Sequence, residues 1–287
     1  MTQPLILDSV ASAIAWRRAQ TEPVVAVFTM GALHSGHSEL MRSARAYLDR
    51  NYDGRGSLVV SIFVNPTQFE NVHDLEAYPR TDVLDYAVCE AARVDAIFQP
   101  SAADMYPTGL DNVVTVHPHD VATILEGESR PGHFVGMLTV VNKLLNVTQP
   151  WATFFGEKDY QQLTLVRTMV RDLNMNVDVV GVPTVRDLDG VALSSRNQRL
   201  DAHGRELAAQ LPAAIAASRH ALSEGHTVID SEKMGYDYLN SQNGIEVDYF
   251  TILSNDLSDA PAQGSARLLV AATIDGVRLI DNAEVEI

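Results

Sequence analysis

The sequence has one cysteine, no long apolar run and no excess of positive charge, and each absence excludes a class of protein. Cys89 has no partner for an intrachain disulfide, and one cysteine is too few for a cysteine-based zinc site. The longest apolar runs have the length of strands, which excludes a transmembrane helix. Acidic residues outnumber basic ones by 37 to 21, and the net charge of −16 argues against nucleic acid as a partner.

The remaining composition is that of an ordinary globular protein. Hydrophobic residues make up 46% and charged residues 20% of the chain, and 287 residues suffice for one large or two modest domains. Residues 1–4 lack the basic and apolar parts of a signal peptide, so we expect a cytoplasmic protein that binds no membrane. Residues 126–199 contain eight acidic and eight basic residues, so the whole acidic excess lies elsewhere. An anionic ligand would favour a segment without excess negative charge. A solvated acidic surface on the rest of the protein explains the same pattern.

Strand-like and helical segments alternate through the first two thirds of the chain. We expect strands at residues 23–28, 57–64, 95–98, 152–155 and 177–182, and helices at 38–48, 82–92, 131–147 and 159–173. Pro131 is expected to open the third of these helices. This order predicts an α/β fold with a doubly wound, Rossmann-like parallel sheet whose sites lie at the carboxyl ends of the strands.

The pattern changes near residue 185. A helix is expected over residues 201–223 with Asp201 as its N-cap, followed by a strand at 244–253. Asp275-Gly276 joins two further strands, 267–274 and 277–280, in the manner of a hairpin. We therefore expect a Rossmann-like nucleotide-binding and substrate-binding domain at residues 1–184, and a smaller α+β lid domain at 185–287.

The run TMGALHSGH at residues 29–37 joins the first of these strands to the first helix. Backbone N–H groups and the positive end of the helix dipole make such a junction a phosphate site. Protonated His34 and His37 would offset phosphate charge there. The alternative is a purely structural glycine turn in which a histidine caps the helix. A zinc site that adds His117 or His119 is conceivable, but no cysteine or clear carboxylate supports it.

Uncharged polar residues follow the strand at 57–64. The amides of Asn65 and Gln68 can bind a carboxylate or hydroxyl group without adding charge, as a small polar substrate requires. His133 lies at the start of the helix at 131–147, where it would face an anion. An Asn-Pro turn and a packing histidine would explain the same residues without a ligand.

Two further segments carry charge or hydroxyl groups suited to phosphate. Lys158 lies in the turn after the strand at 152–155, and Gln162 lies in the first turn of the next helix. Ser194, Ser195 and Arg196 follow the expected domain boundary, in a segment that could close over a triphosphate. The structural alternatives are a solvated charged turn at Lys158 and a polar linker at residues 194–196.

Together these segments resemble the pantoate–β-alanine ligases, a family of the nucleotidylyltransferase superfamily. The resemblance covers residues 20–200 in collinear order, through residues 29–37, 59–69, 78–81, 105–107, 126–134, 155–162 and 193–197. The segments around Gly132-His133 and residues 156–162 are close to diagnostic. The last third of the chain matches only loosely.

The resemblance implies an ATP-dependent and Mg²⁺-dependent ligase, active as a homodimer. In this family pantoate attacks the α-phosphate of ATP to give pantoyl adenylate and pyrophosphate, and β-alanine then displaces AMP. ATP would contact Met30, Gly31, Ala32, Leu33, His34, Ser35, Gly36, His37, Gly156, Glu157, Lys158, Asp159, Val185, Leu193, Ser194, Ser195 and Arg196.

Within this set the resemblance assigns catalysis to His34, His37, Lys158, Ser194, Ser195 and Arg196, with His37 as the proton donor. Gln68 and Gln162 would bind pantoate, with Gln68 also near β-alanine, and we expect Asn65 and His133 to contact the substrates too. Asp85 is a weak candidate for the Mg²⁺ ligand.

The chain departs from the family pattern at four places. Phe28 replaces a usual proline, Leu84 and Val88 lie where some members have polar residues, and residues 70–74 differ from the usual loop. Two alternatives stay open. A sister adenylyltransferase would use a different acceptor, and a non-catalytic nucleotide-binding module would bind ATP without releasing pyrophosphate.

Overall fold

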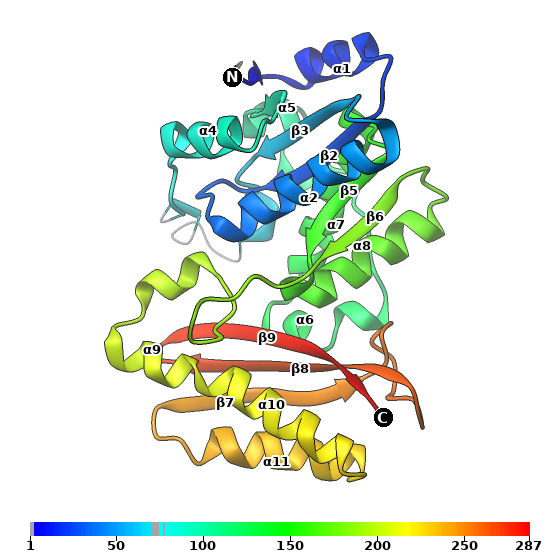
Figure 1. The fold of residues 1–287 in the computed structure, drawn as a ribbon. Helices are drawn as coiled ribbons and strands as arrows, with labels where there is room; N and C mark the ends of the chain where they lie inside the picture. Colours follow the sequence, from blue (N-terminus) through cyan, green and yellow to red (C-terminus); the bar gives the residue numbers. More distant parts are fainter. Residues whose placement is uncertain (1–2, 70–74, 77) are drawn as a thin grey trace. The chain divides into compact units, whose positions relative to one another are not determined.

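Figure 1 shows the computed structural model, which describes residues 3–69, 75, 76 and 78–287. The chain divides into two compact units, neither of which is a single run of sequence. The first contains Met1–Glu157 and Leu165–Pro183, and the second contains Lys158–Thr164 and Thr184–Ile287. The unusual segment at 70–74 lies outside the described residues.

The first unit is built on a sheet of six parallel strands. In chain order they are β1 (Leu5–Leu7), β2 (Val24–Thr29), β3 (Ser57–Ile62), β4 (Ala96–Phe98), β5 (Ala152–Gly156) and β6 (Asp178–Val182). Across the sheet they run β1-β4-β3-β2-β5-β6, so the winding direction reverses between β2 and β5. The doubly wound α/β fold is confirmed, and the carboxyl ends of β2 and β5 form its switch point, where ligands bind in such folds.

Helices cover both faces of this sheet. They are α1 (Val10–Ala19), α2 (Ser35–Tyr52), α4 (Asp82–Ala91), α5 (Ala102–Met105), α6 (Glu126–Ser129), α7 (His133–Thr148) and α8 (Tyr160–Asp172), with 3-10 turns η1 (Pro66–Gln68), η2 (Leu110–Asn112), η3 (Asp120–Ala122) and η4 (Glu157–Asp159). Val25 and Val27 of β2 share a core cluster with Met41 of α2. Val24 and Ala26 point to the opposite face and are equally buried, and α7 contacts β2. No helix in the described ranges is long and apolar enough to cross a membrane.

Two helices begin at residues other than those expected. The second helix of the chain, α2, starts at Ser35 and not at Ser38, because His34 serves as its N-cap. The expectation that Pro131 opens α7 is wrong. Gly132 is the N-cap, with φ of +81°, and the first helical residue is His133. A glycine suits this backbone conformation because it has no Cβ.

The only cysteine lies in the core of the first unit. Cys89 of α4 is fully buried, and burial, followed by the nearby charge of Asp85, raises the pKa of its thiol to about 12. Because the thiolate is the reactive form, we expect Ellman's reagent to label no thiol at pH 8 in the native protein and one thiol per chain in guanidinium chloride. Rapid labelling of the folded protein would contradict this burial.

The second unit combines an antiparallel sheet with helices, which confirms the expected α+β architecture. Its strands β7 (Ile245–Leu253), β8 (Ser265–Ile274) and β9 (Val277–Glu286) are adjacent in chain order. Asp275 and Gly276 have φ of +50° and +73° and form the hairpin turn between β8 and β9. The helices are α9 (Ala202–Ala208), α10 (Gln210–Ser223) and α11 (Val228–Asn240), with the 3-10 turn η5 (Ser195–Arg199) before them.

The single helix expected over residues 201–223 is wrong. Asp201 is the N-cap of α9, as expected, since its side chain accepts a hydrogen bond from the Gly204 N–H at 2.8 Å. The helix then breaks at Ala209 into α9 and α10. Pro212 explains the break, because its ring would clash with the carbonyl of Ala208 in a continuous helix, whereas proline is tolerated in the first turn of α10.

The division near residue 184 lies close to the expected boundary, but Lys158–Thr164 groups with the second unit. The contacts of this segment explain the grouping. Asn282 of β9 donates a hydrogen bond to the backbone of Lys158, and the Tyr160 hydroxyl donates one to the Asn255 carbonyl. Arg267 of β8 also lies over the Tyr160 ring. The lid role of the second unit stays a prediction.

Candidate active site

The turn between β2 and α2 is fixed by a buried carboxylate. Gly31 and Ala32 both have positive φ, +88° and +52°. The Asp85 side chain of α4 accepts the Ala32 N–H at 3.0 Å and the Leu33 N–H at 2.8 Å, and its exposed fraction is 1%. The Thr81 hydroxyl donates a third hydrogen bond to it at 3.0 Å. Asp85 therefore holds the conformation of the turn.

These contacts bear on the expected magnesium site. A protein-held Mg²⁺ needs carboxylate oxygens that face water and substrate phosphates. Both oxygens of Asp85 are occupied by the turn and Thr81, and Leu84 beside it is apolar and 67% exposed. Within the described residues no cluster of three His, Cys, Asp or Glu side chains could hold a metal, whether magnesium or zinc. The residues around Asp85 do not fit a metal site, and we assign Asp85 to positioning.

We expect Asp85→Ala to destabilise the protein strongly. The variant would leave the partly buried N–H groups of Ala32 and Leu33 without acceptors, at about 1–3 kcal/mol each. Denaturant unfolding followed by circular dichroism measures the loss. The control is Asp82→Ala, an exposed acid in the first turn of the same helix, for which we expect about 0.3–1 kcal/mol. Equal losses in the two variants would show that Asp85 does not hold the turn.

The two histidines of the HSGH segment cap the start of α2. The Nδ1 atom of His34 accepts the Gly36 N–H at 3.1 Å, and the Nδ1 atom of His37 accepts the His34 N–H at 3.3 Å. The ring centroids lie 4.2 Å apart. Because each Nδ1 accepts a hydrogen bond, the proton of each neutral ring resides on Nε2. Both rings thus carry their N–H group on Nε2 and lie at a helix N-terminus, which suits an anion.

Gln68 is held by a buried neighbour. Asn65 is 1% exposed, and its amide nitrogen donates to the Gln68 Oε1 at 3.1 Å and to the Gly136 carbonyl at 3.3 Å. Its amide oxygen accepts the hydroxyl groups of Tyr106 at 2.7 Å and Thr67 at 3.1 Å. All hydrogen-bonding groups of the Asn65 side chain are therefore engaged. Asn65 therefore positions Gln68, and its expected contact with a substrate stays a prediction.

The backbone of Gln68 is held from α7. The Nδ1 of His133 lies 3.2 Å from the Gln68 carbonyl oxygen, and its Nε2 lies 3.2 Å from the Arg130 guanidinium. An Nδ1–H tautomer satisfies both contacts, so His133 also positions Gln68, and the substrate contact expected for it stays a prediction. No described residue pairs with the side-chain Nε2 of Gln68, which leaves that donor for a ligand.

Three of the residues expected to bind the polyphosphate share one pocket in the second unit. Lys158, Ser194 and Arg196 line it together with Asn197 and Asp281. Ser194 is the N-cap of η5, and its hydroxyl accepts the Arg196 N–H at 3.3 Å. Within the described ranges Arg196 has no ion-pair partner, so its charge is available to an anion.

The other predicted residues occupy the same segments without lining this pocket. Ser195 is exposed, whereas Val185 and Gln162 are half-buried, and Gln162 lies in the first turn of α8. The Val185 carbonyl accepts the Leu193 N–H at 2.9 Å, which brings these two residues together. Gly156 ends β5, and Glu157 and Asp159 lie in η4. Their contacts with ATP stay predictions.

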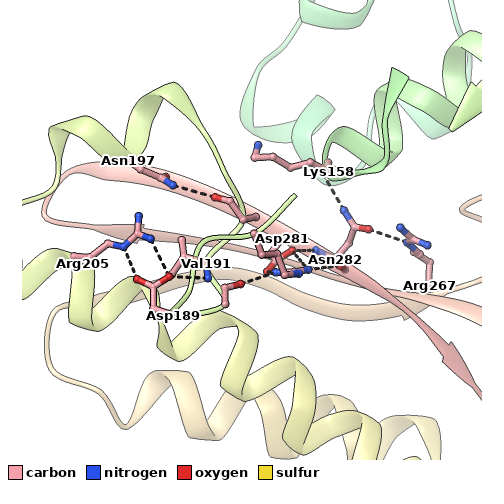
Figure 2. Close-up of polar contacts among 11 residues, drawn as sticks. Lys158, Asp189, Val191, Asn197, Arg205, Arg267, Asp281 and Asn282 are labelled. Carbon is pink, nitrogen blue, oxygen red and sulfur yellow. Dashed lines mark hydrogen bonds and ion pairs between the residues drawn. The ribbon is translucent and has the colours of Figure 1, made fainter. Parts of the chain in front are cut away.

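Strand β9 supplies residues that the sequence analysis did not select. Asp281 accepts two hydrogen bonds from Arg186, at 2.6 and 2.8 Å, and this pairing raises the pKa of the guanidinium above its ordinary value. Asn282 contacts the Lys158 backbone, as Figure 2 shows. The only sequence signal was the polar pair Asp281-Asn282 in the middle of the strand.

A family model and several known proteins match almost the whole chain. The family model described as Pantoate-beta-alanine ligase matches residues 6–284. The chain belongs to the pantoate–β-alanine ligase family. A pantothenate synthetase of Nocardia farcinica is 48% identical over 98% of this chain and 84% of its own. One from Mycobacterium avium is 50% identical over 92% of this chain and 82% of its own.

Solved structures of the family show the same fold. Pantothenate synthetase from Thermus thermophilus superposes with a TM-score of 0.88 at 40% identity, over 97% of this chain and 98% of the other. Pantoate-beta-alanine ligase from Francisella tularensis, complexed with "Beta-gamma ATP and Beta-alanine", gives a TM-score of 0.79 at 35% identity over 98% and 97% of the two chains. The chain is therefore a ligase that joins pantoate to β-alanine.

Proposed function

We propose that this ligase works through a pantoyl-adenylate intermediate, with (R)-pantoate, ATP and β-alanine as substrates. A pantoate carboxylate oxygen attacks the α-phosphorus of ATP, and the bond to pyrophosphate breaks. The β-alanine nitrogen then attacks the acyl carbon, the bond to AMP breaks and the amine loses a proton. This route converts a poor acyl donor into a mixed anhydride with a good leaving group.

The paired histidines at the start of α2 carry this proposal. Their tautomers place N–H donors at a helix N-terminus that follows β2, beside the switch point of the sheet. Donors in this position stabilise the charge that develops on the phosphates during adenylation. We assign His37 the additional role of proton donor, with ATP held along residues 30–37.

The cations of the second unit provide the remaining phosphate contacts. We propose that Lys158 and Arg196 neutralise the polyphosphate and that Ser194 and Ser195 donate hydrogen bonds to it. The shared pocket of Lys158, Ser194 and Arg196 supports this assignment. Residues 156–159, Val185 and Leu193 hold the adenosine. Mg²⁺ supplies charge neutralisation as a complex with ATP, because the residues around Asp85 do not fit a protein-held ion.

Pantoate is assigned to Gln68 and Gln162, and β-alanine to Gln68. The uncharged amides suit a small hydroxy acid, since they hydrogen-bond a hydroxyl or carboxylate without the bare positive charge that would favour a phosphorylated acceptor. The available donor of Gln68 and the contacts with Asn65 and His133 that fix its position support this assignment. We further propose that the enzyme is a homodimer in the cytoplasm, and light scattering on a sizing column tests the dimer.

The test of the mechanism separates its two half-reactions. ATP, Mg²⁺ and pantoate alone should release pyrophosphate in an amount close to the enzyme concentration. Addition of β-alanine should then release AMP and restore turnover. Pyrophosphate release that requires a different acceptor would assign the chain to a sister transferase. Tight binding of ATP without any pyrophosphate would contradict catalysis through these histidines.

A further inference from the structure

A chain of buried side chains links the sheet of the second unit to the backbone of Lys158. Figure 2 shows Asn282 of β9, whose Nδ2 donates a hydrogen bond to the Lys158 carbonyl at 2.9 Å. The Nε of Arg267 donates to the Asn282 Oδ1 at 2.8 Å. The guanidinium carbon of Arg267 lies 4.1 Å from the centre of the Tyr160 ring. We name Asn282, Arg267 and Tyr160 the lysine clamp.

The lysine clamp fixes the orientation of the Asn282 amide. Arginine has only donors, so the amide oxygen of Asn282 must face Arg267, and its NH₂ group must face the Lys158 carbonyl. Burial enforces this arrangement, because Asn282 is 4% exposed and Arg267 and Tyr160 are each 7% exposed. A buried arginine is costly unless its charge is compensated, and the Tyr160 ring provides part of the compensation.

Asn282 does not act on the ligand directly. Its neighbour Asp281 lines the pocket with Lys158, Ser194 and Arg196, whereas the Asn282 side chain faces the Lys158 backbone. The Lys158 side chain is only 17% exposed, so its ammonium group occupies a limited space once the backbone is fixed. Lysine has a long flexible stem, and a fixed backbone reduces the volume over which its charge is spread.

We propose that Asn282 is a positioning residue that sets the place of the Lys158 ammonium group through the lysine clamp. The proposal deepens the proposed function and rests on the phosphate-binding role of Lys158. A displacement of about 1 Å in a group that contacts reacting atoms lowers rates by up to ~100-fold.

The test variant is Asn282→Asp. Its carboxylate still accepts the Arg267 hydrogen bond, which preserves the packing, but it places an acceptor against the Lys158 carbonyl. We expect kcat/KM for ATP in pyrophosphate release to fall by about 10-fold to 100-fold. The matched control is Asn243→Asp in an exposed turn of the same unit, which should stay within about twofold. If Asn282→Asp does not fold, Asn282→Ser shortens the side chain without adding a charge and takes its place.

A double-mutant cycle separates action through Lys158 from a general structural defect. If Asn282 acts through the lysine, Asn282→Asp in the Lys158→Ala background should cause no further loss beyond about twofold. A further tenfold loss in that background would overturn the proposal, because the effect would then bypass Lys158.

A spectroscopic measurement tests the lysine clamp without reference to activity. The chain has three lysines, Lys143, Lys158 and Lys233, so reductive methylation with ¹³C gives one side-chain resonance for each. Asn282→Asp should shift the Lys158 resonance and leave the other two in place. An unchanged Lys158 resonance overturns the lysine clamp whatever the assay shows. Absence of pyrophosphate release by the unmodified enzyme counts against the proposed function alone.

Discussion

His37→Ala should lower the rate of pantoate-dependent pyrophosphate release by ~10²–10⁴-fold and leave the protein folded. The variant removes an N–H donor at the start of α2, where the proposed mechanism places the developing phosphate charge. It also removes the hydrogen bond from the His34 backbone N–H, which costs about 1 kcal/mol of stability as the loss of a helix cap. The first effect exceeds the second, so catalysis should fall far more than stability. Rapid-quench measurement of pyrophosphate and a thermal melt report the two quantities.

Two conservative variants separate the role of the Nδ1 acceptor from that of the Nε2 donor in the His37 ring. His37→Asn keeps an acceptor at the position of Nδ1 and should stay as inactive as the alanine variant. His37→Gln places an amide N–H near the position of Nε2 and should recover part of the rate. The control is His220→Ala, whose ring is 72% exposed and pairs with Glu224 on the surface. If folded His37→Ala lost less than about threefold in the rate of pyrophosphate release, His37 would have no role in catalysis.

Lys158→Ala should lower the same rate by ~10²–10³-fold, the usual loss when one preorganised charge-stabilising group is removed. The ammonium group lies in a pocket with Ser194 and Arg196, and its nearest acid is Asp159, at 3.7 Å. Asp159 is itself 54% exposed, so this pair is weakened by water and does not neutralise the lysine. Single-turnover pyrophosphate release at saturating ATP isolates the chemical step.

The control for this variant is Lys233→Ala. Lys233 is 69% exposed and pairs with Asp237 on α11, so its loss should change neither rate nor binding measurably. Lys158→Arg should recover less than half of the lost rate, because the rigid guanidinium fork does not reproduce a compact ammonium charge. Full activity of Lys158→Ala would mean that Arg196 alone compensates the polyphosphate.

The hydrophobic pattern predicted helices and strands that bury one face or both faces. It did not predict elements that depend on contacts with residues distant in the sequence. The Asp275-Gly276 turn and the strand at β2 are local signals and were found within a residue or two. Edge strand β1 has only three residues and depends on pairing with β4, so no local pattern marks it. Helix α11 was missed although Thr227 caps it and bonds Asp230, a signal that the sequence does contain.

The site shows the same division between local and distant information. The HSGH turn and the Lys158 turn follow strands directly, so motif and spacing identified them. The family resemblance made Asp85 a candidate metal ligand. Its contact with Ala32 joins residues 53 apart in the chain, so the sequence did not indicate it. The predicted substrate contacts of Asn65 and His133 stay predictions, and the structure adds that both residues hold Gln68. A sequence shows which side chains are able to bind a ligand. It shows less readily which side chains hydrogen-bond to one another in the fold.

The contact between Lys158 and Asn282 spans 124 residues, and it has a consequence for biosynthesis. At ~5–20 residues per second a ribosome needs roughly 6–25 s to add that stretch. During this interval the nascent chain carries Lys158 without the strand that orders it. The pocket of the second unit that contains Lys158 can therefore form only after β9 has been synthesised.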